Sequence, residues 1–186
     1  QISAGIFTYL DPILEEFNPD WVLAVGDTTT VLTTSLLAFY RKIRFGHVEA
    51  GLRTHNKWHP FPEEINRRLA TVTADLHFAP TDWSKGNLLR EGIEPEKIHV
   101  TGNSVIDALK FVASREEPRE IVELLGKLRI KRLEAGELEI GDLDSKRLVL
   151  VTAHRRENFG APMENICIAL RELAAREDVE IVYPVH

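Results

Sequence analysis

The sequence predicts an α/β fold built around a doubly wound parallel sheet. Short apolar runs alternate with helical patterns along most of the 186 residues, and strand–helix–strand units of this kind have parallel strands. Polar residues follow several runs directly, as Gly26-Asp27-Thr28 and Gly102-Asn103-Ser104 do. Ligands bind at the carboxyl edge of an open parallel sheet, so we expect the functional residues to lie there.

The chain is expected to begin with an amphipathic helix. Its apolar positions recur at helical spacing and comprise Ile6, Leu10, Ile13, Leu14 and Phe17. Asn18-Pro19-Asp20 should end this helix, because none of these residues favours its continuation. A short apolar run at 21–25 then predicts the first buried strand.

The next helix and strand complete a βαβ unit. The helix is expected over 29–41, with Asp27 or Thr28 as its N-cap, and the strand after it ends at Glu49. Because the two strands of such a unit are parallel, Asp27 and Glu49 should emerge from the same edge of the sheet, on adjacent strands.

The alternation continues to about residue 113, the expected end of the first domain. Helices are expected after Pro62, over 82–91 and from Ser104 onward, with strands at 76–79 and 98–101. Two of these helices should turn apolar residues inward, namely Ile65, Leu69 and Val72 in the first and Val105, Ile106 and Leu109 in the last.

The composition changes in the second part of the chain. Residues 114–146 are expected to form a connecting helix and a variable surface segment, and residues 147–186 the start of a second, incomplete Rossmann-like domain. Strands are expected at 148–152 and 179–183, with a helix over 163–176 between them. Ile166, Leu170 and Leu173 should face inward, and Cys167 should be a small core residue.

The overall composition excludes several classes of protein. A net charge of −6 with 28% charged residues argues against nucleic acid as the main partner, since such proteins are usually basic. One cysteine excludes an internal disulfide framework, and no apolar run approaches the ~20 residues that span a bilayer. We expect a cytoplasmic protein without membrane insertion, and a piece of a longer chain, since no initiator Met precedes Gln1.

The stretch from His47 to Arg68 is the densest in chemistry. Its 22 residues hold three acids, three histidines and three arginines. Glu49 follows a buried strand, and Glu63 and Glu64 begin a helix after Pro62. An acid in a first helical turn also interacts favourably with the helix dipole, by ~0.3–1 kcal/mol. For either glutamate alone, this structural role is therefore as good an explanation as a functional one. Three acids within one stretch favour a site.

A second candidate site follows the strand at 148–152. His154, Arg155 and Arg156 precede a helix N-terminus, and Gly160 permits close backbone approach. Cations and free helix N–H groups suit a phosphate or diphosphate, although a solvated basic turn is the alternative. The carboxylates show no metal-ligand pattern, so we expect acid–base chemistry on a carbon or hydroxyl, with no metal and no cofactor.

The other histidines have simpler interpretations. His77 and His99 lie within strands and should be packing or edge residues. His47 shares a sheet face with Glu49 and is expected to orient that carboxylate. His55 and His59 lie on a loop and should be solvated.

Six motifs together resemble the non-hydrolysing UDP-N-acetylglucosamine 2-epimerase family. They are GDTTT at 26–30, HVEAGLRT at 47–54, PFPEEINR at 60–67, TGNSVIDAL at 101–109, TAHRRENFG at 152–160 and IVYPVH at 181–186. The resemblance implies two Rossmann-like domains in a glycosyltransferase-B-like arrangement and a homodimer. It also implies interconversion of UDP-GlcNAc and UDP-ManNAc for cell-surface polysaccharides, by elimination and re-addition of UDP.

The resemblance also implies roles for individual residues. Asp27, Glu49 and Glu63 match the family's catalytic carboxylates, and His154 its active-site histidine against the UDP leaving group. Arg155 and Arg156 would help to bind UDP. In some bacterial members a second UDP-GlcNAc acts as an activator, and Arg155 and His186 resemble that regulatory pocket. The family's opening strand with its Gly-Thr-Arg phosphate loop, and the second half of its C-terminal domain, have no counterpart in this sequence.

Two other functions stay open at this point. A metallophosphoesterase also places Gly-Asp and Gly-Asn at strand ends, but it needs a histidine where this chain has Ser104. A sugar-nucleotide sensor without turnover would retain the fold and lose the acids, whereas all three carboxylates and His154 are present.

Overall fold

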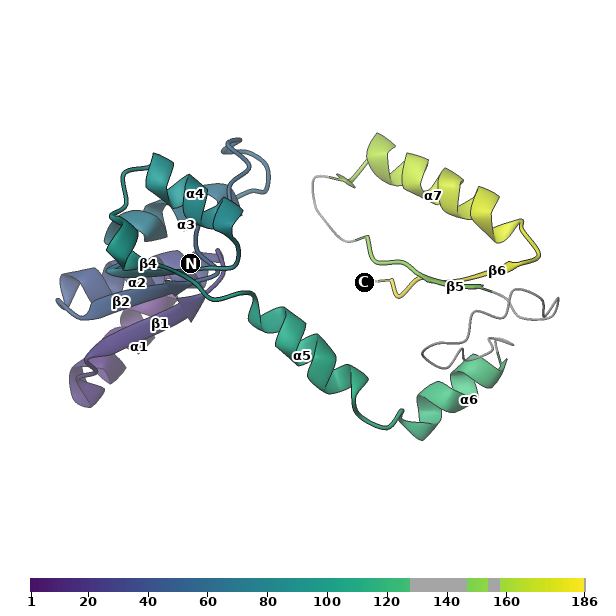
Figure 1. Cartoon of the computed structure of the whole chain (residues 1–186), viewed down its shortest axis with the longest axis horizontal. Coiled ribbons are helices and arrows are strands. Elements are labelled where there is room, and N and C mark those ends of the chain that lie inside the picture. The colour runs from purple at the N-terminus through teal and green to yellow at the C-terminus, as the bar shows by residue number, and fades with distance from the viewer. Residues whose placement is uncertain (128–146, 154–157, 186) are drawn as a thin grey trace. The chain divides into compact units, whose positions relative to one another are not determined.

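The computed structural model describes residues 1–127, 147–153 and 158–185. The chain divides into two compact units, Gln1–Ala113 and Ser114–His186, and Figure 1 labels their helices and strands. Each unit contains a sheet of parallel strands with helices between them. The α/β class and the parallel strands predicted from the sequence are therefore confirmed.

The first unit alternates strands and helices in chain order. Its elements are α1 (Ile2–Phe17), β1 (Trp21–Val25), α2 (Thr29–Tyr40), β2 (Arg44–Val48), α3 (Glu63–Thr73), β3 (Leu76–Ala79), α4 (Asp82–Arg90), a 3₁₀ turn (Pro95–Lys97), β4 (Ile98–Val100) and α5 (Ser104–Ala113). The strands lie side by side in the order β1-β2-β3-β4. All three pairings are parallel, so the four carboxyl ends share one edge.

Residues at the ends of these elements explain where the helices begin and stop. Asn18 adopts the left-handed conformation that closes α1, which confirms the predicted stop. Thr28, one of the two predicted caps, accepts a hydrogen bond from Val31 N at 3.4 Å and begins α2. Thr81 caps α4 in the same way, through Ser84 N at 3.2 Å.

Helices cover one face of this sheet. Strands in sequential order with right-handed crossovers place α2, α3 and α4 on the same side. The main core lies there, where Phe45 of β2 packs with Val31 and Ala38 of α2 and Ala70 of α3. On the other face Leu23 and Val25 of β1 are 61% and 60% exposed. Among the described residues, the doubly wound pattern is therefore only half formed.

The predicted inner face is wrong for two of three residues in α3, where Ile65 is half-buried, and for all three residues in α5. Leu69 and Val72 are 47% and 80% exposed, whereas α3 buries Glu64, Arg67, Ala70 and Thr71. The polar part of this face meets loops at the carboxyl edge, and Ala70 permits close approach to α2. The apolar residues of α5 are more than half exposed, namely Val105, Ile106 and Leu109, because no described element packs over them.

The second unit is smaller and less buried. It comprises α6 (Arg119–Lys127), β5 (Arg147–Leu150), α7 (Ala161–Ala174) and β6 (Val179–Val182), with β5 and β6 paired in parallel. Ile166 and Leu170 are half-buried, but Leu173 is exposed. Cys167 is exposed too, so its predicted place in a core is wrong. The two strands and two helices described in this unit have too little surface to enclose it.

None of the helices that the structure describes combines the length and the apolar character needed to cross a membrane.

Candidate functional site

Asp27 and Glu49 lie at the carboxyl ends of β1 and β2. Val25 and Val48 are partners in the register, and Gly26 N donates a hydrogen bond to Val48 O at 3.0 Å. A Cβ placed on Gly26 would lie 3.6 Å from Glu49 Oε2, so this carboxylate lies over the glycine that precedes Asp27. The predicted meeting of the two acids at one edge on adjacent strands is confirmed.

Helix α3 fixes Asp27 from the side. Arg67 Nη1 lies 3.4 Å from Asp27 Oδ2, and Asn66 Nδ2 donates to the Asp27 carbonyl at 2.9 Å. The Arg67 side chain is only 8% exposed. The shielded guanidinium therefore fixes the direction of the Asp27 carboxylate, while the Asp27 side chain stays 29% exposed to a ligand.

Glu63 begins α3, one turn before Arg67 on the same face of the helix. Its side chain is half-buried, and its Oε2 is shielded from solvent without a hydrogen-bond partner among the described residues. Buried polar atoms are nearly always partnered. The unpartnered oxygen therefore marks Glu63 as a candidate functional residue and not only a structural one.

Glu64 has the opposite surroundings. It is fully buried, and its carboxylate accepts hydrogen bonds from Thr54 N and His55 N, both at 3.0 Å. Arg67 Nε lies 3.0 Å away as an ion pair, although its direction falls short of a hydrogen bond. Burial alone would raise the pKa of Glu64, but the Thr54 hydrogen bond, the Arg67 charge and the His55 hydrogen bond together hold the pKa below its ordinary value. Glu64 thus ties the loop after β2 to α3.

His47 does not orient Glu49, contrary to the sequence-based prediction. It is fully buried, and its Nε2 lies 2.8 Å from the carbonyl of Gly26. Burial lowers the pKa of His47, against the opposing effect of this hydrogen bond, so the neutral ring donates Nε2–H to Gly26. The contact fixes the Gly26–Asp27 turn, whereas Asn103 Nδ2 is the donor to Glu49, at 2.9 Å.

The remaining histidines match their simpler interpretations. His77 is fully buried in β3, and burial is the main cause that lowers its pKa to about 4. His99 is exposed and stacks on Phe78 with ring centroids 5.9 Å apart. His55 and His59 are exposed on the loop before α3, as predicted.

Four residues of this region were not predicted from the sequence as members of the site. Asn66, Arg67 and Asn103 contact the two strand-end acids directly. Arg53, with a side chain that is 0% exposed, pairs with Glu91 through two of its nitrogens at 2.8 and 2.7 Å. Helical spacing from Glu63 could have identified Arg67, and Asn103 directly follows a strand-end glycine.

The predicted anion site belongs to segments of the second unit that the structure does not describe. His154, Arg155, Arg156 and His186 all lie outside the described residues. Within 1–127, 147–153 and 158–185 no group of three or more His, Cys, Asp or Glu side chains could hold a metal ion.

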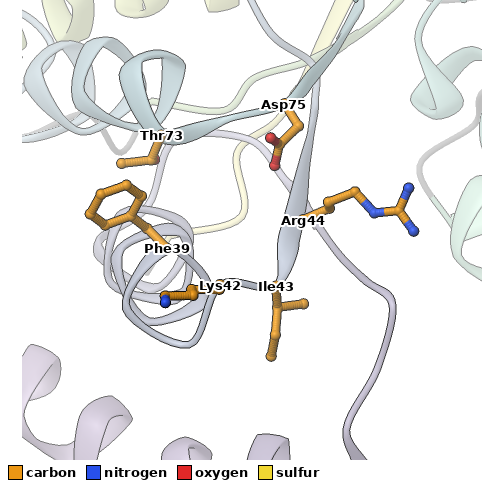
Figure 2. A pocket seen from close by; sticks show the side chains of 6 residues that line it. All are labelled: Phe39, Lys42, Ile43, Arg44, Thr73 and Asp75. Carbon is orange, nitrogen blue, oxygen red and sulfur yellow. The ribbon is translucent and has the colours of Figure 1, made fainter.

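A surface pocket of about 210 Å³ lies at the opposite edge of the first sheet. Figure 2 shows its lining, in which Arg44 begins β2, Lys42 and Ile43 directly precede that strand, and Asp75 directly precedes β3. Asp75 Oδ2 accepts a hydrogen bond from Phe45 N at 2.7 Å. Since Arg44 begins the strand that Glu49 follows, this pocket is separate from the acids.

The whole chain matches one protein family. Residues 1–186 match the model described as UDP-N-acetylglucosamine 2-epimerase. Curated relatives with that name include proteins of Escherichia coli K12, 50% identical over 187 residues, and Salmonella typhimurium, 49% identical over 187 residues. Each alignment covers 100% of this chain and 47% of the relative, so the chain spans about half of their length.

Solved structures of UDP-GlcNAc 2-epimerases are also similar to this chain. The UDP-GlcNAc 2-epimerase of Neisseria meningitidis bound to UDP-GlcNAc is 44% identical with a TM-score of 0.84, over 100% of this chain and 47% of that one. The Methanocaldococcus jannaschii enzyme in complex with UDP-GlcNAc and UDP is 33% identical with a TM-score of 0.78, over 99% and 47%.

Proposed function

Since this chain belongs to the UDP-N-acetylglucosamine 2-epimerase family, we propose that the protein containing it interconverts UDP-GlcNAc and UDP-ManNAc. Relatives of about twice its length bear that name, and two solved relatives hold UDP-GlcNAc. The complete protein is therefore the proposed isomerase, of which this chain supplies about half.

The proposed chemistry is elimination followed by re-addition. A carboxylate removes the proton from C2 of the sugar, the C1–O bond to UDP breaks, and a C1=C2 double bond forms. UDP then adds back to C1 while a proton is delivered to the opposite face of C2, which inverts that centre. No electrons are gained or lost by the substrate overall, so these reaction steps need no redox cofactor.

Asp27, Glu49 and Glu63 are the proposed catalytic carboxylates. The observation that supports this most is the shielded, unpartnered oxygen of Glu63, on the helix that also contacts Asp27. A positioned acid or base contributes typically ~10²–10⁴-fold to a rate. Any of the three can be the base at C2, and Asp27 and Glu49 can also contact the substrate.

The UDP group is assigned to the second unit on sequence grounds. We propose that His154, Arg155 and Arg156 bind the diphosphate ahead of α7 (Ala161–Ala174), whose N-terminal N–H groups favour an anion. Arg155 and His186 are proposed to contact a second, regulatory UDP-GlcNAc.

The complete protein is proposed to have two doubly wound Rossmann-like domains in the glycosyltransferase-B-like arrangement. The first would end near residue 113, with 114–146 as a connection and the second domain from 147. A cytoplasmic homodimer that supplies ManNAc for cell-surface polysaccharides is the corresponding cellular role.

The test is turnover in D₂O by the protein encoded by the complete reading frame. We expect UDP-ManNAc formed from UDP-GlcNAc to carry deuterium at C2, with transient release of UDP, as followed by NMR. Retention of the original C2 hydrogen would contradict elimination. Tight binding of UDP-GlcNAc without any product would instead indicate a sugar-nucleotide sensor.

A further inference from the structure

Glu49 has an unusual backbone conformation. Its φ is +66°, in the left-handed region that residues with a Cβ adopt at a cost of ~1–2 kcal/mol. Such conformations persist where the surroundings fix them, and they cluster at functional sites. Here the left-handed conformation turns the chain directly after β2, so that the Glu49 carboxylate lies over Gly26.

One hydrogen bond fixes the carboxylate itself. Asn103 Nδ2 donates to Glu49 Oε1 at 2.9 Å. Asn103 follows β4 (Ile98–Val100), whereas Glu49 follows β2, so the bond passes over the end of β3. No described residue hydrogen-bonds to the other oxygen, Oε2, which stays free for a ligand.

The orientation of the Asn103 amide is set from the other side. Its Oδ1 accepts a hydrogen bond from Val105 N at 2.9 Å, in the first turn of α5 (Ser104–Ala113). An amide oxygen accepts and an amide nitrogen donates. Capping α5 with the oxygen therefore forces the nitrogen toward Glu49, and the helix fixes the direction of the donor.

We propose that Asn103 is a positioning residue, which holds Glu49 Oε1 so that Oε2 meets the substrate in a reactive geometry. This inference rests on the proposed function. A donor held on both sides costs little reorganisation during the reaction, and a misplacement of about 1 Å can cost ~10²-fold in rate.

Two substitutions in the complete protein separate positioning from capping. Asn103→Ser retains a hydroxyl that can cap α5 but is too short to reach Glu49, and we expect kcat to fall ~10–100-fold with little change in KM. Asn103→Asp also retains the cap but places a second carboxylate against Glu49. Because two adjacent carboxylates resist joint ionisation, the acid limb of the pH–rate profile should move up by ~1 pH unit.

The matched control is Thr81→Ala, which removes the cap of α4 without touching Glu49. It should lower the melting temperature and leave the pH–rate profile unchanged. The inference is overturned if both Asn103 variants keep the parent kcat and profile, or if they change only the melting temperature, as the control does. Absence of UDP-ManNAc formation by the unsubstituted protein would contradict the proposed function itself, and so distinguishes the two failures.

Discussion

Glu63 and Glu64 are adjacent in the chain, yet their surroundings give them different tasks. Glu64 accepts two backbone hydrogen bonds and pairs with Arg67 while fully buried. Glu63 has a shielded oxygen without a partner among the described residues. A buried carboxylate with partners stabilises the fold, whereas one without them costs stability and is retained for function.

Replacing Glu63 by Gln in the complete protein should therefore reduce activity and spare stability. We expect kcat to fall ~10²–10⁴-fold, with UDP-GlcNAc binding and the melting temperature close to the parent values. Asp27→Asn should have the same effect on kcat. Steady-state kinetics and calorimetric binding measure both, and parental turnover in either variant would contradict the assignment.

Glu64→Gln is the matched change, and it should reduce stability. It replaces one of the two carboxylates beside the buried Arg67 by a neutral amide and leaves Asp27 as the other, which we expect to cost ~2–4 kcal/mol. The pKa of Glu64 in the folded protein is lowered from 4.5. Its contribution to the free energy of unfolding is therefore fully present above pH 4.5 and is lost as the pH falls through the folded-state pKa. Urea unfolding at pH 7 and at pH 3 should therefore show a smaller difference between variant and parent at pH 3. An equal difference at both pH values would be evidence against this role.

His77 should make the first unit sensitive to mild acid. Its pKa is about 4 in the folded protein against 6.5 for a free side chain, so the unfolded state binds the proton first. The contribution of His77 to the free energy of unfolding is therefore fully present above pH 6.5 and decreases between pH 6.5 and about 4. At pH 5 the decrease from this residue is about 2 kcal/mol. Urea unfolding of His77→Leu should show a smaller loss between pH 7 and pH 5, whereas the exposed His99→Leu should behave as the parent does.

At the scale of elements, the sequence predicts strands and helices well because their signals are local. The run at 21–25 and the Asn18 stop match β1 and the end of α1. Which face of a helix is buried depends on its neighbours, and there the prediction fails. Helix α3 buries Glu64 and Arg67 because it meets polar loops.

The residues of the site likewise divide into those that the sequence predicts and those that it does not. Asp27 and Glu49 could be identified because strand ends are visible in the sequence and parallel pairing brings them together. The contact of Asn103 with Glu49 depends on strand order, and no local pattern encodes it. The role of His47 was missed because its partner is a backbone carbonyl, which is the same in every residue.

The loop after β2 depends on close packing at Gly51. Its φ is +88°, and an added Cβ would lie 2.4 Å from the carbonyl oxygen of Ser84 in α4. We expect Gly51→Ala to destabilise the protein by ~3–5 kcal/mol, since backbone cannot move aside as a side chain can. Gly92→Ala is the control, because its φ is +86° with nothing within 4 Å, and it should cost only ~1–2 kcal/mol. Equal melting temperatures for the two variants would contradict the packing argument.

At the scale of the whole molecule, the exposed apolar surface is the main feature. Leu23 and Val25 lie on the uncovered sheet face, and Val105 and Leu109 on α5 are both 63% exposed. A parallel sheet is normally covered on both faces. The chain spans about half the length of its curated relatives, and we expect the rest of the complete protein to cover these residues.

The chain of 186 residues on its own should therefore bind the sugar nucleotide weakly and associate with other copies of itself. Exposed apolar patches promote aggregation, and a sugar nucleotide held by half of its contacts loses the remote binding energy that positions the reacting carbon. We expect light scattering of purified 1–186 to show self-association, and NMR to detect no UDP-ManNAc. Leu23→Lys with Val25→Thr should reduce the association, because the pair lies on the uncovered face, without restoring activity. A monodisperse and active fragment would mean that these 186 residues already contain every group needed for turnover, and the expectation that activity needs the complete protein would have to be abandoned.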